Sequence, residues 1–180
     1  QGKGTYRHSN RINQTNRLTI LRLKEGGHTF SKEEGMSPYL LYQEKNMKRK
    51  ETREEAVKIA YSMDVNKEFN VINIPEFLEH FELEEMDVDY LNKTISDMID
   101  NMEEIDKYIT DNSKDWKITR IAKVDLAVLR VALSEILYNE TIPESVSINE
   151  AVEISKKFSN EDSHKFINGI LGTVVRCIKK

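Results

Sequence analysis

The sequence has few of the residues that cross-link a chain or interrupt a helix. Its 180 residues include a single cysteine, Cys177, with only three prolines and seven glycines. One cysteine cannot form an intrachain disulfide or a zinc site of several cysteines, which fits a reducing, cytoplasmic setting. Five of the glycines lie in the first 35 residues, so the rest of the chain is almost free of helix breakers. The sequence therefore predicts an all-α body.

Signals for a membrane segment, a metal site or an active site are also missing. Apolar residues make up 38% of the chain and charged residues 32%, and the mean hydropathy is −0.60. No run of about 18 apolar residues could span a bilayer, and the four histidines have no metal-ligand spacing. Neither a glycine-rich phosphate loop nor a nucleophile elbow occurs. We therefore expect a soluble protein with no membrane partner, no cofactor, no metal and no enzymatic activity.

The net charge of −4 conceals an uneven distribution. Residues 1–46 contain eight Lys/Arg and four Asp/Glu, whereas residues 47–180 contain nineteen and twenty-seven. Residues 68–106 alone contain thirteen acidic residues and one base, Lys93. This charge would repel the phosphates of a nucleic acid, so any such binding requires a local basic patch.

The sequence pattern changes at Met47, and we predict the domain boundary there. Residues 1–46 mix Gly, Ser, Asn, Gln and Thr with scattered bases and show no helical period. They are expected to be an appendage outside the fold: a vector-derived segment, the product of a mis-assigned upstream start, or a native basic tail. Residues 47–180 form the expected helical domain.

Apolar periodicity predicts the helices of this domain. They are one helix around residues 56–63, a short one after Pro75, a long one over 91–109, a central one over 121–137, one from Ser147 to about Phe158, and one from Asp162 to Ile178. Ser147 and Glu150 have the spacing of a capping box at the start of the fifth helix. A turn at residues 111–113 divides these six or seven helices into two subdomains, which are expected to pack together.

Four segments of the helical domain resemble the NusB family of transcription antitermination factors. They are KRKETREEAVKIAY (48–61), AKVDLAVLRVALSEI (122–136), SINEAVEISKKF (147–158) and EDSHKFINGIL (161–171). The resemblance covers residues 47–180 and implies an all-helical fold of two small bundles without catalysis. It further implies binding to the boxA element of nascent ribosomal RNA transcripts, together with the ribosomal protein NusE, in an antitermination complex with RNA polymerase.

A basic segment is the first candidate RNA site. Lys48, Arg49, Lys50 and Arg53 are expected to precede or open the first helix, where free amides and the helix dipole would add to their attraction for phosphate. The alternative is an ordinary solvated helix start, because acidic residues are interleaved with these bases and can pair with them. The resemblance favours the RNA site, although this segment has fewer arginines than is common in the family.

Aromatic side chains that stack on unpaired bases are the second element of an RNA site. Phe166 and Tyr61 are the candidates, with Lys165 as a neighbouring cation and Asp162 as an acceptor for a base edge. The resemblance implies that Asp162 and Phe166 lie at the RNA surface. The residues alone favour Phe166 in the core and Asp162 as a helix cap, and they leave Tyr61 open between the surface and an apolar helix face.

Asp125 and Arg130 interrupt the apolar central helix and are the candidate partner-binding residues. They either form ion pairs with neighbouring helices or belong to the surface that receives NusE. A buried arginine without a partner is costly, so a carboxylate is expected near Arg130. Two residues depart from the family pattern, because Ser134 stands where tyrosine is common and Gly172 where aspartate is common.

Two other functions remain open at this point. A similar helical domain precedes the catalytic domain of certain ribosomal RNA cytosine methyltransferases, although no catalytic cysteine motif is present here. A helical adaptor that binds only protein is the second alternative. Both a monomer and a homodimer are compatible with the sequence.

Overall fold

The computed structural model describes residues 38–70, 87–113 and 117–179, with side chains from Lys48 onward. The chain divides into a unit of residues 1–42 and a unit of residues 43–180. This division falls close to the change in sequence pattern at Met47, but a single helix runs through both points. The short helix expected after Pro75 lies outside the described residues.

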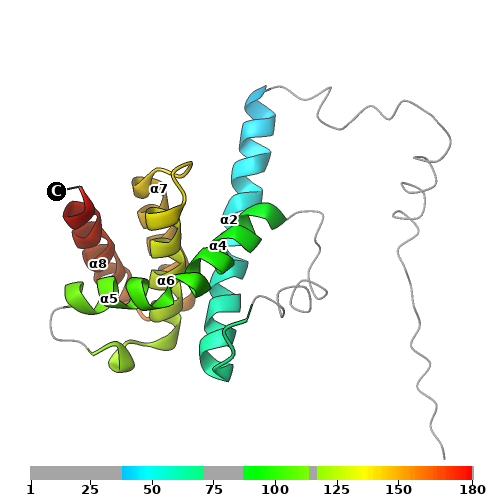
Figure 1. Ribbon diagram of the computed structural model, residues 1–180. Helices are drawn as coiled ribbons and strands as arrows, with labels where there is room; N and C mark the ends of the chain where they lie inside the picture. The colour runs from blue at the N-terminus through cyan, green and yellow to red at the C-terminus, as the bar shows by residue number, and fades with distance from the viewer. Residues whose placement is uncertain (1–37, 71–86, 114–116, 180) are drawn as a thin grey trace, which may run out of the picture. The chain divides into compact units, whose positions relative to one another are not determined.

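Helices are the only regular structure in the described ranges, so the predicted all-α class is confirmed (Figure 1). The six α-helices are α2 (Pro38–Asn66), α4 (Val88–Asp100), α5 (Met102–Asn112), α6 (Lys123–Tyr138), α7 (Glu144–Phe158) and α8 (Ser163–Ile178). A short 3-10 helix, η3 (Ile118–Arg120), precedes α6.

Helix α6 is the centre of the bundle. It is buried on nearly every side from Asp125 to Glu135 and packs against α4, α5, α7 and α8. Helix α2 adds one apolar stripe, which includes Ala56, Ile59 and Met63, to the same core. The two predicted halves therefore pack together around a single core. Figure 1 shows α4 and α5 following one another across the bundle, while α7 and α8 run crosswise to them.

The predicted long helix over 91–109 is wrong in one respect, because it is two helices. The backbone breaks at Asn101, whose N–H donates to the carbonyl oxygens of Asp97 and Ile99, while its side-chain amide donates to Asp97 at 2.8 Å. Met98 and Ile105 on either side of the break are both fully buried. The apolar pattern thus continues through the break, since both helices turn the same face to the core.

The starts of two helices also differ from the predictions. Helix α2 begins at Pro38, so residues 48–53 lie inside a helix and their amides are not the free amides of a helix start. Helix α7 begins at Glu144, directly after Pro143, so Ser147 is not an N-cap and the predicted capping box is wrong. Helix α8 begins at Ser163, where the sequence predicts it.

Candidate nucleic-acid interface

The basic segment of α2 is partly engaged by acidic residues of the same chain. Lys50 is exposed, and Lys48 and Arg49 are half-exposed. Arg49 pairs with Asp87, its Nη2 lying 2.7 Å from Oδ2. The other oxygen of Asp87 accepts the backbone N–H of Tyr90 and caps α4. Arg49 is therefore held by a carboxylate at the start of α4, while Lys50 has the most exposed side chain of the segment.

Arg53, predicted to bind RNA, is instead only 5% exposed. Its Nε donates to Oε1 of Glu135 at 2.6 Å, and its Nη1 lies 3.6 Å from Glu150. Burial acts to lower the pKa of Arg53, but the charges of Glu135 and Glu150 and the hydrogen bond to Glu135 outweigh burial and raise it. The guanidinium therefore joins α2 to α6 and α7 and is not available at the surface.

Tyr61 on α2 and Phe158 at the end of α7 both have exposed rings. Tyr61 on α2 is 40% exposed, one turn after Lys58. The ammonium of Lys58 lies 5.8 Å from the ring centre of Phe158, and that of Lys157 lies 5.0 Å from the same ring. Tyr61 therefore lies on the same exposed side of α2 as Lys58, which reaches the ring of Phe158 at the end of α7.

Phe166 is half-buried on α8 and lies between two open clefts of about 420 and 430 Å³. The Arg176 cleft is lined by Asn112, Ser113, Lys165, Phe166, Gly169, Ile170, Thr173 and Arg176. The Arg120 cleft is lined by Arg120, Ile121, Ala122, Asp125, Asn160, Asp162, Ser163 and Phe166. The ring packs on the core with one part and borders both clefts with another, so it is accessible to a ligand.

Asp162 and Lys165 lie at the rim of these clefts and are both highly exposed. They form an ion pair of 2.8 Å, with side chains 85% and 72% exposed. The hydrogen bond from Lys165, followed by its charge, lowers the pKa of Asp162, which therefore stays ionised and able to accept hydrogen bonds. Such an exposed pair is weak and exchanges readily for contacts with a ligand.

Asp125 and Arg130, the candidate partner-binding residues, both face the interior at 6% exposure. Asp125 accepts the hydroxyls of Ser159 at 2.5 Å and Ser163 at 2.9 Å, which holds the start of α8 on α6. Neither residue presents its charge on the surface for a partner.

Arg130 confirms the prediction of a nearby carboxylate. It donates twice to Asp106 at 2.8 Å and once to Asp64 at 3.1 Å. Burial acts to raise the pKa of Asp64, but hydrogen bonds from Lys123 and Arg130 lower it overall. This network joins α2, α5 and α6.

Basic residues of α2 and α8 converge on α7. The hydrogen bond and charge of Lys156 lower the pKa of Glu153, and the charges of Lys50 on α2 and His164 on α8 lower it further. Lys157 on α7 also pairs with Glu54 on α2 at 2.5 Å. The exposed end of the basic segment and the start of α8 therefore lie near the same helix.

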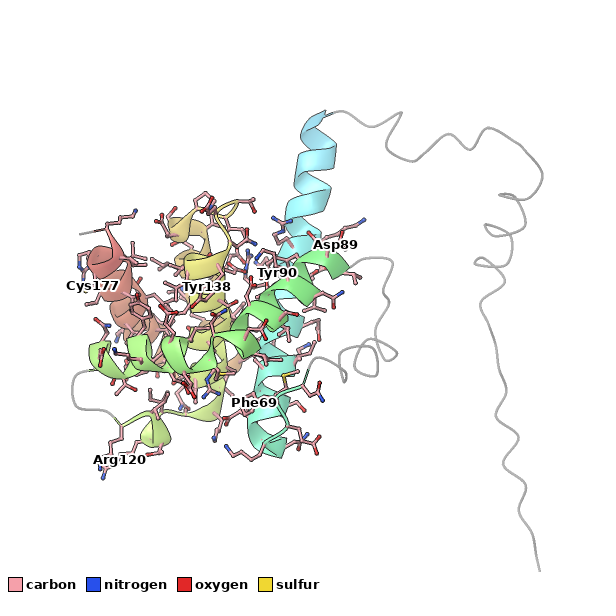
Figure 2. All side chains as sticks on the ribbon, viewed as in Figure 1. Phe69, Asp89, Tyr90, Arg120, Tyr138 and Cys177 are labelled. Atoms are coloured by element: carbon pink, nitrogen blue, oxygen red, sulfur yellow. The ribbon has the colours of Figure 1, made fainter. Side chains whose placement is uncertain are left out.

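Two arginines beside Phe166 were missed by the sequence reasoning. Arg120 and Arg176 each line one of the clefts, and neither forms an ion pair with any residue that the structure describes. Figure 2 shows Arg120 on η3 with its side chain pointing away from the helices. The signal was present in the sequence, because neither arginine has an acidic residue three or four positions away.

Features of other protein classes are absent from the described part of the chain. No group of three or more His, Cys, Asp or Glu side chains there could hold a metal ion. None of the described helices is long and apolar enough to cross a bilayer. The described part of the chain is an all-helical bundle with charged surface clefts.

Comparisons with known proteins identify the family. The family model described as "NusB family" matches residues 50–176, so the chain belongs to the NusB family. The transcription antitermination protein NusB of Alkaliphilus oremlandii is 43% identical over 72% of this chain and 94% of its own length. Because the relatives are named for antitermination and not for a reaction, they support the expectation that the chain is not an enzyme.

Solved structures share the fold. A structure of T. maritima NusB aligns with a TM-score of 0.64 at 29% identity, covering 71% of this chain and 90% of that one. A second, of the antitermination factors NusB and NusE in complex with dsRNA, aligns with a TM-score of 0.62 at 23% identity, covering 71% and 96%. At that identity the second structure supports the helical fold alone.

Proposed function

We propose that this chain is a cytoplasmic transcription antitermination factor that binds boxA-like single-stranded RNA of nascent ribosomal RNA transcripts. It does so together with the ribosomal protein NusE and acts within an RNA polymerase antitermination complex. The observation that carries the RNA-binding part is the accessible ring of Phe166 between two clefts, each with an arginine that has no ion pair in the described residues. Partner and boxA element come from the family resemblance.

The geometry supports single-stranded RNA because unpaired bases are bound by stacking and by hydrogen bonds to their edges. Phe166 offers the stacking surface, and the ionised Asp162 beside it offers an acceptor for the amino group of a base. Lys50 of the basic segment and the exposed lysines of α7 provide charge for the backbone.

A titration of boxA RNA and of a scrambled RNA, each with and without NusE, tests the proposal. We expect boxA RNA to bind more tightly than scrambled RNA and NusE to increase that difference. A chain that binds NusE but shows no gain from either RNA is a protein-only adaptor, and the proposal is then rejected.

Replacing Phe166 with alanine tests the stacking role. Loss of one base stack costs about 1–3 kcal/mol, so Phe166→Ala should weaken the binding of boxA RNA by about 5- to 150-fold and that of scrambled RNA by less. Tyr138→Ala is the matched control, because Tyr138 is also a half-buried ring packed on the same core but binds Glu104 of the acidic α5. Equal losses for both RNAs in the Phe166 variant would contradict a role in sequence preference.

A further inference from the structure

The two clefts that meet at Phe166 differ in charge. The Arg120 cleft contains the carboxylates of Asp125 and Asp162 beside its one arginine. The Arg176 cleft contains two cations, Lys165 and Arg176, and no acidic residue among its lining side chains. In a chain whose net charge is −4, a cleft with only positive charge selects for an anionic ligand.

Arg176 is held over the cleft by a neutral partner. Its Nη2 donates to the hydroxyl of Thr173 at 2.9 Å, and its Nη1 lies where a Cβ added at Gly172 would come within 3.6 Å. No described carboxylate pairs with it. The guanidinium is therefore positioned by a neutral hydroxyl group, and no described carboxylate competes with a phosphate for its donors.

The size and the rim of the cleft also suit part of a nucleotide. Its volume of about 420 Å³ falls within the usual range of small-ligand sites. Lys165 at the rim is 72% exposed, and its pair with Asp162 is a surface pair that a phosphate can replace. Gly169 in the cleft lining leaves open space, since a Cβ added there would meet nothing within 4 Å.

We infer that the Arg176 cleft is a phosphate subsite for the nucleotide next to the one whose base stacks on Phe166. Arg176 is the main phosphate ligand and Lys165 a second one. The Arg120 cleft, with the exposed carboxylate of Asp162 as its acceptor, receives the base edge. Phe166 thus separates a base-reading cleft from a backbone-binding cleft. This inference rests on the proposed function and adds a subsite to it.

Removing the charge of Arg176 gives the first test. A charge-assisted phosphate contact is lost in Arg176→Gln, so affinity for boxA RNA should fall by about tenfold. The slope of log K against log salt should fall by about 0.7, the value for one phosphate of a single strand. Lys107→Gln is the control, because it makes the same change in net charge at an exposed site on α5. The affinity of Lys107→Gln for boxA RNA should change by less than about twofold.

Filling the cleft gives a second test, in which a loss of RNA binding could not be attributed to unfolding. Gly169→Ala and Gly169→Leu both replace a glycine within α8 by a strong helix former, so both should raise the melting temperature. Only leucine is long enough to occupy the space where the phosphate would lie. We expect Gly169→Leu to bind boxA RNA at least about fivefold more weakly than Gly169→Ala, whose methyl group fills far less of the space.

The outcomes separate this inference from the proposed function. If the unchanged chain binds boxA RNA while Arg176→Gln and Gly169→Leu bind it equally well, the phosphate subsite is rejected and RNA binding stands. If the unchanged chain shows no preference for boxA RNA with NusE present, the proposed function fails and the subsite with it. Loss of affinity in Arg176→Gln and Gly169→Leu, with Lys107→Gln unaffected, supports the subsite.

Discussion

The carboxylate of Glu135 is almost fully buried, and hydrogen-bond donors from three other helices compensate for the loss of water around it. Arg53 of α2 and the hydroxyl of Tyr90 on α4 donate to one oxygen, and the hydroxyl of Ser147 on α7 donates to the other at 2.6 Å. Burial and the nearby charge of Glu135 raise the pKa of Tyr90, so its hydroxyl remains a donor. Figure 2 shows Tyr90 where α4 crosses α2. Glu135 thus fixes the helix that carries the basic segment.

Neutralising Glu135 should therefore destabilise the fold strongly. In Glu135→Gln the guanidinium of Arg53 stays buried without a full countercharge, and we expect the free energy of unfolding to fall by about 3 kcal/mol, measured by urea denaturation. The double variant Arg53→Met with Glu135→Leu should lose less than the sum of its two single variants. Additive losses in that cycle would show that the pair is not energetically coupled.

Asp64 should make stability depend on pH in the acid range. Its hydrogen bonds with Lys123 and Arg130 lower its pKa in the folded chain below the ordinary value of 3.8. A carboxylate with a lowered folded pKa stabilises the fold above its ordinary pKa and loses that contribution as pH falls through the folded value. The free energy of unfolding should therefore drop below about pH 4, and less steeply in Asp64→Asn. Asp100→Asn, at the exposed end of α4, is the control and should leave the profile unchanged.

At the level of helices, apolar periodicity in the sequence predicts which segments are helical but not where every helix starts or breaks. Helices α6 and α8 and the end of α7 follow from stripes that are buried in the structure. The break at Asn101 was not predictable from that pattern, because the buried face continues across it. The start of α2 at Pro38 was missed for the opposite reason: the residues before Met47 show no apolar stripe, although the helix includes them.

The site was predictable only where a side chain's role depends on its near neighbours in sequence. Asp162 and Lys165 were predicted as polar neighbours of Phe166 at the start of α8, where the structure has them at the surface. Arg53 and Ser147 were misassigned because both bind Glu135, which lies 82 and 12 residues away along the chain. Long-range partners of this kind decide whether a polar side chain is buried, and periodicity contains no information about them.

Ser147 gives a prediction at the level of α7. Because its hydroxyl is a buried donor to Glu135 and not a helix cap, Ser147→Ala should lower the free energy of unfolding by about 1–2 kcal/mol. The melting temperature should fall by about 2–8 °C in a scanning calorimeter. Ser145→Ala, at an exposed position in the first turn of the same helix, should have almost no effect. Similar losses for both variants would indicate a general effect on the start of α7.

At the level of the whole molecule, an acidic protein must bind RNA through local charge. Residues 47–180 carry eight more acidic than basic side chains. Acidic residues are dense on α4 and α5, whereas the exposed bases near the candidate interface lie on α2, α7 and α8. Several of those bases are already paired, among them Arg49 with Asp87 and Lys157 with Glu54. The charge available for phosphates is therefore smaller than the number of lysines and arginines suggests.

A triple variant in which Lys48, Arg49 and Lys50 are all replaced by glutamine tests how much of the attraction for phosphate comes from the basic segment. The variant should bind boxA RNA and scrambled RNA more weakly by the same factor, since phosphate contacts carry no sequence information. Three phosphate contacts to a single strand would lower the salt slope by about 2, and the pairing of Arg49 with Asp87 predicts a smaller decrease. Replacing the exposed Lys67, Lys93 and Lys107 makes the same change in net charge outside the two clefts and the basic segment, and should leave the slope unchanged. Equal decreases in both triple variants would mean that overall charge, and not the basic segment of α2, governs the attraction for RNA.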